Sequence, residues 1–155
     1  ELTALRDAGI TVEVVPGISA ALAASADIGQ SLTQRGMSRS AVFVTPCFGD
    51  GESNHDWARV AATADTVALY MASRQAAAIS GGLIAAGVPA SRPAVFVENA
   101  SLPSRRVVAT RVGKLSAGAS ELGDGPALLL IGDVYAEIVA AAEQMESGAT
   151  RWMTA

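Results

Sequence analysis

The stretch Pro126-Ala127-Leu128-Leu129-Leu130-Ile131-Gly132 is the most apolar in the chain, and it decides the fold class. An apolar run bounded by Pro and Gly is typical of a strand that is buried on both faces of a sheet. Similar runs occupy Ala41–Thr45, Thr66–Met71 and Pro93–Glu98, and a less apolar one occupies Arg106–Val112. Helix-like segments separate these runs. The alternation predicts an α/β domain of three layers, in which helices cover both faces of one sheet.

Helices are expected before, between and after these strands. The predicted segments are Leu2–Ala8, Ser19–Ile28, Asp56–Ala64, Ser73–Ala86 and Val134–Met145. Gly9 and Gly87 are suitable C-caps, and Asp56 and Ser73 are suitable N-caps. A further strand is predicted over the β-branched run Ile10–Val15, which stops at Pro16-Gly17.

Ligands in such sheets bind beyond the carboxyl ends of the strands, so the segments after the strands are the candidate binding loops. These are residues 16–20, 46–49, 72–74, 99–101 and Asp133. Several contain small residues, which let a ligand approach main-chain N–H and C=O groups. The alternative is that Gly17, Ser19, Ala20 and Ala100 are only turn and helix-start residues. No G-x-G-x-x-G, P-loop or G-x-S-x-G motif decides between the two.

The composition excludes several classes of protein. The chain has 155 residues, of which 50% are hydrophobic and 17% are charged, so it is too apolar for a disordered segment. The formal charge of −4 argues against a nucleic-acid binder. No stretch reaches about 18 uninterrupted apolar residues, and no secretory signal is recognised, so we expect no membrane span and a cytoplasmic location.

The chain has one cysteine, Cys47, and one histidine, His55. A single cysteine cannot form an internal disulfide. One cysteine and one histidine are also too few ligands for a Cys/His zinc site, so no metal is expected. A catalytic triad would need His55, which lies in a polar stretch. A solvated loop histidine is the better interpretation.

Five segments follow one another in order along the chain. They are Val14-Val15-Pro16-Gly17-Ile18-Ser19-Ala20, then Ser31-Leu32-Thr33-Gln34-Arg35-Gly36, then Thr66-Val67-Ala68-Leu69-Tyr70-Met71, then Pro93-Ala94-Val95-Phe96-Val97-Glu98-Asn99-Ala100-Ser101 with Arg105-Arg106, and finally the stretch 126–132. In this order they resemble the V-P-G-[IV]-[ST]-[SA], L-T-H-R, T-x-V-x-Y-M, P-x-x-x-V-E-x-[AG]-[ST] with Q-R, and P-A-[LI]-x-x-[IV]-G elements of the tetrapyrrole methylase family. The L-T-x-R-G and Tyr-Met segments are most similar to the members that methylate uroporphyrinogen III.

The resemblance implies a three-layer α/β sandwich with a mostly five-stranded mixed sheet, the second domain of a tetrapyrrole methylase. Residues 1–15 are then expected to be the end of an N-terminal domain, and residues 16–155 the C-terminal domain. The family binds its methyl donor, S-adenosylmethionine, in the cleft between two domains. The family's G-x-G-D donor loop should lie upstream of Glu1, so we expect this polypeptide alone to be inactive or non-catalytic, able to dimerise and to bind the donor weakly if at all.

The family's donor contacts fall on Ser19, Ala20, Met71 and Ala100, where small residues favour main-chain contacts. Ser replaces the family's Thr at position 19 and keeps the hydroxyl. Ala72 replaces the usual Gly after Tyr-Met, and Gln34 replaces the usual His of L-T-H-R.

The implied reaction is C-methylation of uroporphyrinogen III to precorrin-2, on the route to sirohaem and cobalamin. This reaction depends on aligning the methyl donor with the pyrrole carbon more than on a metal or a protein nucleophile. No residue is identified as the acceptor of the proton that the macrocycle then loses. Ten of the eleven basic residues are Arg, the side chain that grips carboxylates as a fork. Arg35 is the first candidate for the substrate's carboxylates, and Arg39 and Arg74 are weaker ones. Each could instead be a surface cation.

Other interpretations remain open at this point. Glu98 either organises the site or is a strand-edge carboxylate. The scaffold could act on another precorrin or on a non-tetrapyrrole acceptor such as RNA, which the acidic charge disfavours. A homodimer is expected. Residues 1–15 are expected to expose apolar surface, so this segment should fray or pair with a second copy of the chain.

Overall fold

The computed structural model describes residues 1–46 and 56–152, and one five-stranded sheet organises them. The spatial order of the strands is β1-β2-β5-β3-β4. β1 and β2 are parallel, whereas β5 is antiparallel to both of its neighbours and β4 is antiparallel to β3. The sheet is therefore mixed, as the family resemblance implies. The strands are β1 (Ala41–Val44), β2 (Thr66–Leu69), β3 (Pro93–Glu98), β4 (Arg106–Arg111) and β5 (Ala127–Gly132).

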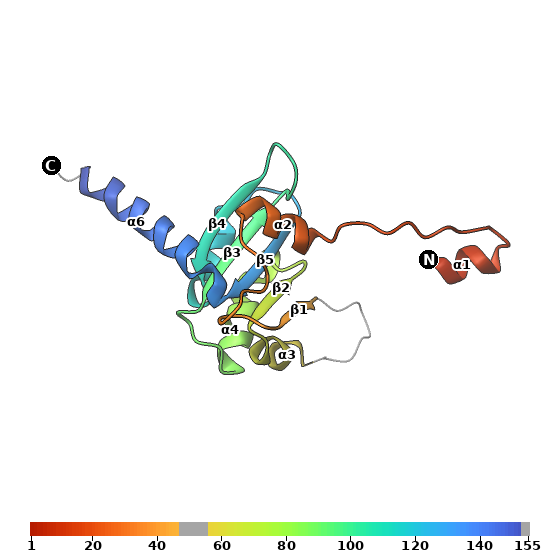
Figure 1. Ribbon diagram of the computed structural model, residues 1–155, viewed down its shortest axis with the longest axis horizontal. Helices are drawn as coiled ribbons and strands as arrows, with labels where there is room; N and C mark the ends of the chain where they lie inside the picture. The colour runs from red at the N-terminus through yellow and green to blue at the C-terminus, as the bar shows by residue number, and fades with distance from the viewer. Residues whose placement is uncertain (47–55, 153–155) are drawn as a thin grey trace.

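Helices cover both faces of this sheet, so the three-layer prediction is confirmed (Figure 1). Alternate residues of each central strand enter opposite cores: in β3, Phe96 packs on one side and Val95 and Val97 on the other. The first core also contains α3 (Trp57–Thr63), α4 (Ala76–Ala85) and α5 (Leu115–Ser120). The second contains α2 (Ala20–Ile28) and the first turns of α6 (Ala136–Trp152).

Local signals fix the ends of several helices. Ser19 caps α2, and its Oγ accepts a 3.3 Å hydrogen bond from the Ala21 N–H. α2 ends at Gly29, whose φ of +67° is a left-handed conformation that glycine adopts at no steric cost. Asp56 caps α3 by accepting from the Arg59 N–H. Ser73 is not the N-cap of α4; it lies in a short 3₁₀ turn, η1 (Ser73–Gln75), that leads into the helix.

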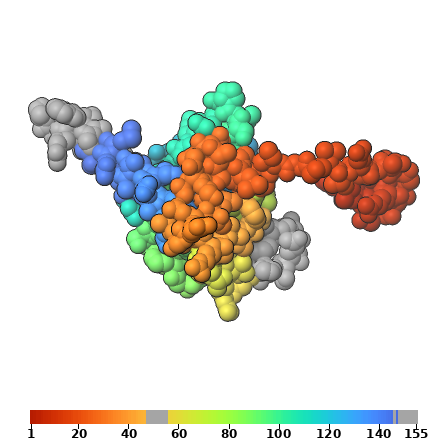
Figure 2. All heavy atoms as spheres, viewed as in Figure 1, coloured from red at the N-terminus to blue at the C-terminus, as the bar shows by residue number. Residues whose placement is uncertain are grey.

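The prediction of a strand at Ile10–Val15 is wrong. After α1 (Leu2–Asp7), residues 10–19 form neither helix nor strand. They run away from the sheet as an extended arm that carries α1 with it (Figures 1 and 2). Val14 and Val15 are 70% and 77% exposed. Their β-branched side chains favour extended backbone, but a strand also needs a neighbour to pair with, and the described residues provide none for this segment.

The direction of each strand decides which loops meet. β1, β2 and β3 point the same way, so their carboxyl ends share one edge of the sheet, together with the amino ends of β4 and β5. The loops after β2 and β3 therefore meet the loop that precedes β5. Asp133 follows the antiparallel β5 and lies at the opposite edge, so it does not join the candidate loops. Cys47, His55 and most of the loop 46–49 lie outside the described residues.

Candidate functional site

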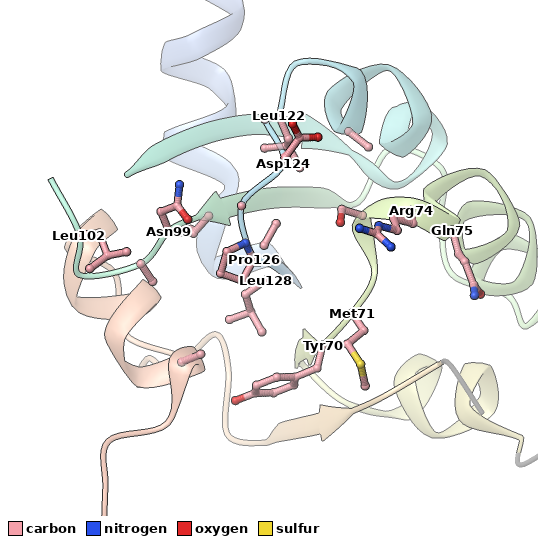
Figure 3. A pocket seen from close by; sticks show the side chains of 18 residues that line it. Tyr70, Met71, Arg74, Gln75, Asn99, Leu102, Leu122, Asp124, Pro126 and Leu128 are labelled. Carbon is pink, nitrogen blue, oxygen red and sulfur yellow. The ribbon is translucent and has the colours of Figure 1, made fainter. Parts of the chain in front are cut away.

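A cavity of about 770 Å³ opens at the edge where the loops after β2 and β3 meet the loop before β5 (Figure 3). Its walls are mostly apolar or small, with a few polar side chains, which is the usual character of small-molecule sites. The lining residues come from the start of α2, from β2 and η1, from the end of β3, and from residues 119–128. Those most relevant to binding are Ala20, Tyr70, Met71, Arg74, Asn99, Ala100, Asp124 and Gly125.

Three of the four predicted donor contacts line this cavity. Ala20, Met71 and Ala100 come from segments far apart in the sequence, yet they border one hollow. The fourth, Ser19, is not a lining residue, but it is bonded to one. The Ser19 Oγ lies 2.5 Å from the Oη of Tyr70.

Tyr70 joins the start of α2 to the end of β2. Besides its bond to Ser19, the Tyr70 Oη accepts a 3.3 Å hydrogen bond from the main-chain N–H of Ala21. The ring also lies against Phe43 of β1, with the two centroids 6.4 Å apart. The phenol thus ties the start of α2 to the end of β2, so that Ala20 and Met71 line the same cavity.

Two non-glycine residues of the cavity have left-handed backbone. Met71 has φ of +54° and Asn99 has φ of +53°, and each directly or nearly follows a strand on either side of β5. This conformation is uncommon for Asn and costly for a long side chain such as Met. Residues held in such conformations concentrate at binding sites, and here both turns face the same cavity.

Glu98 supports the loop that forms the far wall of the cavity. The residue is 2% exposed, and its Oε1 accepts a 2.9 Å hydrogen bond from the Gly125 N–H. The Oε2 lies 3.9 Å from the Arg106 Nε, which supplies the opposite charge. A Cβ on Gly125 would lie 2.3 Å from the Asn99 Oδ1, so a larger residue there would have to displace the Asn99 side chain. These contacts support the interpretation of Glu98 as a residue that organises the site.

A second carboxylate fixes the loop that carries Ala100. Asp27, near the end of α2, accepts a 2.7 Å hydrogen bond from the Ser101 N–H and a 2.9 Å bond from the Arg105 guanidinium. The Ser101 bond, with a smaller contribution from Arg105, lowers the pKa of Asp27 below its ordinary value. The carboxylate therefore stays ionised at neutral pH and holds residues 101–105 against α2.

The structure does not bring Arg35 to this cavity. Arg35 is exposed in the turn between Gln34 and Ser38, and Ser38 bonds to Thr66 at the amino end of β2. That end is the opposite edge of the sheet. Arg39 lies at the same edge, where its N–H donates to Asp65.

Asp65 is the centre of the polar cluster at that opposite edge. It accepts from the main-chain N–H groups of Arg39 and Ser40 and from the Ser40 hydroxyl, at 2.9 to 3.0 Å. The bond from the Arg39 N–H is the largest cause of a lowered pKa at Asp65. The cluster fixes the segment that leads into β1 and has a structural role.

The loop at residues 119–128 is the part of the cavity that sequence reasoning missed. The expectation that ligands bind beyond the carboxyl ends of strands does not point to this loop, because it lies at the amino end of β5. One signal was present, because Gly123-Asp124-Gly125-Pro126 is a dense group of turn residues directly before the most apolar strand.

Within residues 1–46 and 56–152, no group of three or more His, Cys, Asp or Glu side chains is placed to hold a metal ion. None of the helices described over the same ranges has both the length and the apolar character needed to cross a membrane.

Comparison with known proteins identifies relatives of this chain. The family model for tetrapyrrole (corrin/porphyrin) methylases matches residues 1–116. Siroheme synthase 1 of Cronobacter sakazakii is 38% identical over 134 residues, which are 86% of this chain and 28% of that protein.

Two solved structures are similar in fold. Uroporphyrin-III C-methyl transferase from Thermus thermophilus, complexed with S-adenosyl homocysteine, superposes with a TM-score of 0.72 and 32% identity, over 86% of this chain and 57% of that one. A cobalt precorrin-4 methyltransferase superposes with a TM-score of 0.75 and 25% identity, over 86% of this chain and 56% of that one.

The chain spans little more than a quarter of the siroheme synthase and just over half of each methyltransferase. The family model nevertheless covers most of the sequence, and the fold agrees with that of the matched structures. This chain belongs to the tetrapyrrole methylase family.

Proposed function

We propose that this tetrapyrrole methylase chain supplies the donor-binding half of an S-adenosylmethionine-dependent methyltransferase that converts uroporphyrinogen III to precorrin-2. The observation that carries the proposal is the cavity at the sheet edge. Three positions that the family resemblance assigns to the donor, Ala20, Met71 and Ala100, line that single cavity although they are 51 and 29 residues apart in the sequence.

The cavity suits a ligand of the donor's size and character. Its volume lies within the roughly 300–1,000 Å³ typical of small-molecule sites. Val97, Leu102 and Leu128 offer apolar surface for a flat heterocycle, while Asn99 offers an amide. Small side chains at Ala20 and Ala100 leave main-chain groups within reach of polar atoms. A related methyltransferase has been crystallised with S-adenosyl homocysteine, which is the donor's product.

The donor, when bound, supplies a methyl group that is already activated by a sulfonium. The new bond joins that methyl to a pyrrole carbon, the carbon–sulfur bond breaks, and the macrocycle later loses a proton. The chain's contribution is to hold both partners in line, which can supply a large part of a displacement barrier. Tyr70, Ser19 and Asp27 serve this role by fixing the loops that border the cavity.

We further propose that residues 16–155 form the C-terminal domain of the enzyme and that residues 1–15 pack with a preceding domain. The exposure of Val14 and Val15 supports this, because a long apolar arm in water is unfavourable. Replacing both with Ser in the isolated 155-residue chain should reduce its self-association in light scattering. Unchanged self-association would contradict this assignment.

We also propose that the enzyme is a cytoplasmic homodimer. Arg35 is proposed to hold carboxylates of the substrate. The distance of Arg35 from the cavity requires that the macrocycle extend toward the other sheet edge or that Arg35 act from a second copy. Arg35→Gln would then raise the KM for uroporphyrinogen III without changing the affinity for S-adenosylhomocysteine.

The direct test uses the full-length natural protein that contains these residues. It should methylate uroporphyrinogen III when S-adenosylmethionine is supplied. Ala100→Leu should abolish binding of S-adenosylhomocysteine in calorimetry by filling the cavity, whereas Ala78→Leu, on an exposed position of α4, should not. Absence of methyl transfer to uroporphyrinogen III would end the proposal.

One observation favours an alternative methyl acceptor, a later precorrin in place of uroporphyrinogen III. The chain superposes on a cobalt precorrin-4 methyltransferase with a TM-score of 0.75. A panel of tetrapyrroles separates the two: activity on a later precorrin and none on uroporphyrinogen III would reverse the order of preference.

A further inference from the structure

Two opposite charges border the cavity without neutralising each other. Arg74 and Asp124 both line it, and no ion pair joins them among the described residues. In the part of the chain that the structure describes, neither side chain has a hydrogen-bond partner. Other arginines are engaged: Arg92 donates to main-chain carbonyls, and Arg111 pairs with Glu143.

The backbone that carries Arg74 is fixed. Arg74 sits in the middle of η1, directly after the turn at Met71. The Gln75 N–H donates to the Ala72 carbonyl at 3.2 Å, and both Ala72 and Ala76 are buried in the core beneath the turn. Figure 3 shows Arg74 on the same side of the cavity as Met71, with Asn99 and Leu102 on the other side. An anchored backbone therefore presents an uncommitted guanidinium to the hollow.

A guanidinium in this setting selects for a carboxylate. Its planar fork of N–H donors matches the two oxygens of a carboxylate, and the charge-assisted bonds are stronger beside an apolar wall than in water. Arg74 is exposed at the mouth of the cavity, whose apolar lining includes Ala119, Leu122 and Leu128, and Asp124 is the only other charged side chain among the lining residues that the structure describes.

We propose that Arg74 binds a carboxylate of the ligand that occupies this cavity, and so determines which ligand is accepted. The inference rests on the proposed function, since both reactants of that methyl transfer carry carboxylates. One source is the amino-acid end of the donor, and the other is an acidic side chain of the macrocycle. The chemistry at Arg74 is the same for both.

The test compares Arg74→Gln, Arg74→Lys and the control Arg59→Gln in the full-length natural protein. Arg59 is a suitable control because it is exposed on α3 and pairs only with Asp56 within the described residues. Calorimetry measures binding of S-adenosylhomocysteine and of methylthioadenosine, which lacks the amino-acid end. Steady-state kinetics measure the KM for uroporphyrinogen III.

Loss of the charge-assisted bond should weaken the affected ligand by about tenfold in Arg74→Gln, with partial recovery in Arg74→Lys. If the donor is the source, S-adenosylhomocysteine binds more weakly and methylthioadenosine is unchanged. If the macrocycle is the source, both nucleosides bind normally and the KM rises.

Two results would overturn the inference. One is that all three measurements match the wild type and Arg59→Gln. The other is that S-adenosylhomocysteine and methylthioadenosine weaken equally, which would mean a structural effect independent of any carboxylate. A wild-type protein that binds no S-adenosylhomocysteine and transfers no methyl group would instead refute the proposed function itself.

Discussion

Gly125→Ala is the substitution whose effect the structure defines best, because the loop that holds Gly125 packs against the turn after β3. A Cβ at this position would lie 2.3 Å from Oδ1, 2.6 Å from Nδ2 and 2.7 Å from Cγ of Asn99. Turning the amide of Asn99 would exchange oxygen and nitrogen but leave Cγ in place. The whole side chain would have to swing away, or the loop would have to move by about 1 Å, to restore ordinary contact.

Such overpacking costs about 1–3 kcal/mol in proteins. For a chain of this size that corresponds to a fall in melting temperature of roughly 2–4 °C per kcal/mol. The second variant, Asn99→Gly, removes the atoms that collide and keeps the two main-chain bonds at position 99, to Pro126 and from Leu102. Glycine also accepts the φ of +53° at this position. In that background Gly125→Ala should cost less than about 0.5 kcal/mol.

Urea unfolding of the four proteins of this double-mutant cycle measures the coupling between the two sites. Gly81→Ala is the matched control, because a Cβ there meets nothing within 4 Å and Gly81 lies inside α4. That change should stabilise the protein by up to about 1 kcal/mol. If Gly125→Ala destabilises the wild type and the Asn99→Gly variant equally, the clash with Asn99 is not the cause and the reasoning fails.

Three further predictions concern single side chains. Tyr70→Phe removes the bonds to Ser19 and Ala21, so S-adenosylhomocysteine should bind roughly two- to tenfold more weakly in calorimetry, and an unchanged affinity would contradict the role given to the phenol. Asp65→Asn should lower the melting temperature at pH 6, and the difference from the wild type should shrink as the pH falls below 3.8. The pKa of Asp65 is lowered from 3.8, chiefly by the bond from the Arg39 N–H, so its stabilising effect is present above that value and is lost as the pH falls through the folded-state value; a difference independent of pH would refute this. Tyr135→Phe should raise the free energy of unfolding by about 1 kcal/mol, because the buried Oη has no hydrogen-bond partner within the described residues, and a clear destabilisation in urea would show that the hydroxyl is satisfied.

The central strands could be predicted from the sequence because burial on both faces leaves an unmistakable pattern. The run Pro93–Glu98 is buried at every position and has the predicted bounds. The run Ile10–Val15 has equally strong β-branched character but forms no strand, and no sequence pattern predicts α5, which contains Gly118. A Cβ on Gly118 would lie 3.1 Å from Thr110, so the position of α5 depends on packing against β4 rather than on helix propensity.

The candidate site was only partly predictable for a similar reason. Ala20, Met71 and Ala100 were predicted through the family motifs as donor contacts, and all three line one cavity in the structure. Arg74 was only a weaker carboxylate-binding candidate in the sequence, ranked below Arg35, since nothing local reveals that its guanidinium lacks a partner among the described residues. Strand direction explains why Asp133 does not join the candidate binding loops as predicted. The sequence shows that β5 is buried but not that it runs antiparallel to β2 and β3.

The place of β5 in the sheet also constrains how the domain is made. β2 and β3 do not pair with each other; β5, the last strand of the sheet to leave the ribosome, fills the gap between them. Until residue 132 has been synthesised, β1-β2 and β3-β4 can exist only as separate two-stranded pieces with open edges. A nascent chain is therefore exposed to misassociation until β5 has been translated, and a chaperone would be needed most in that interval.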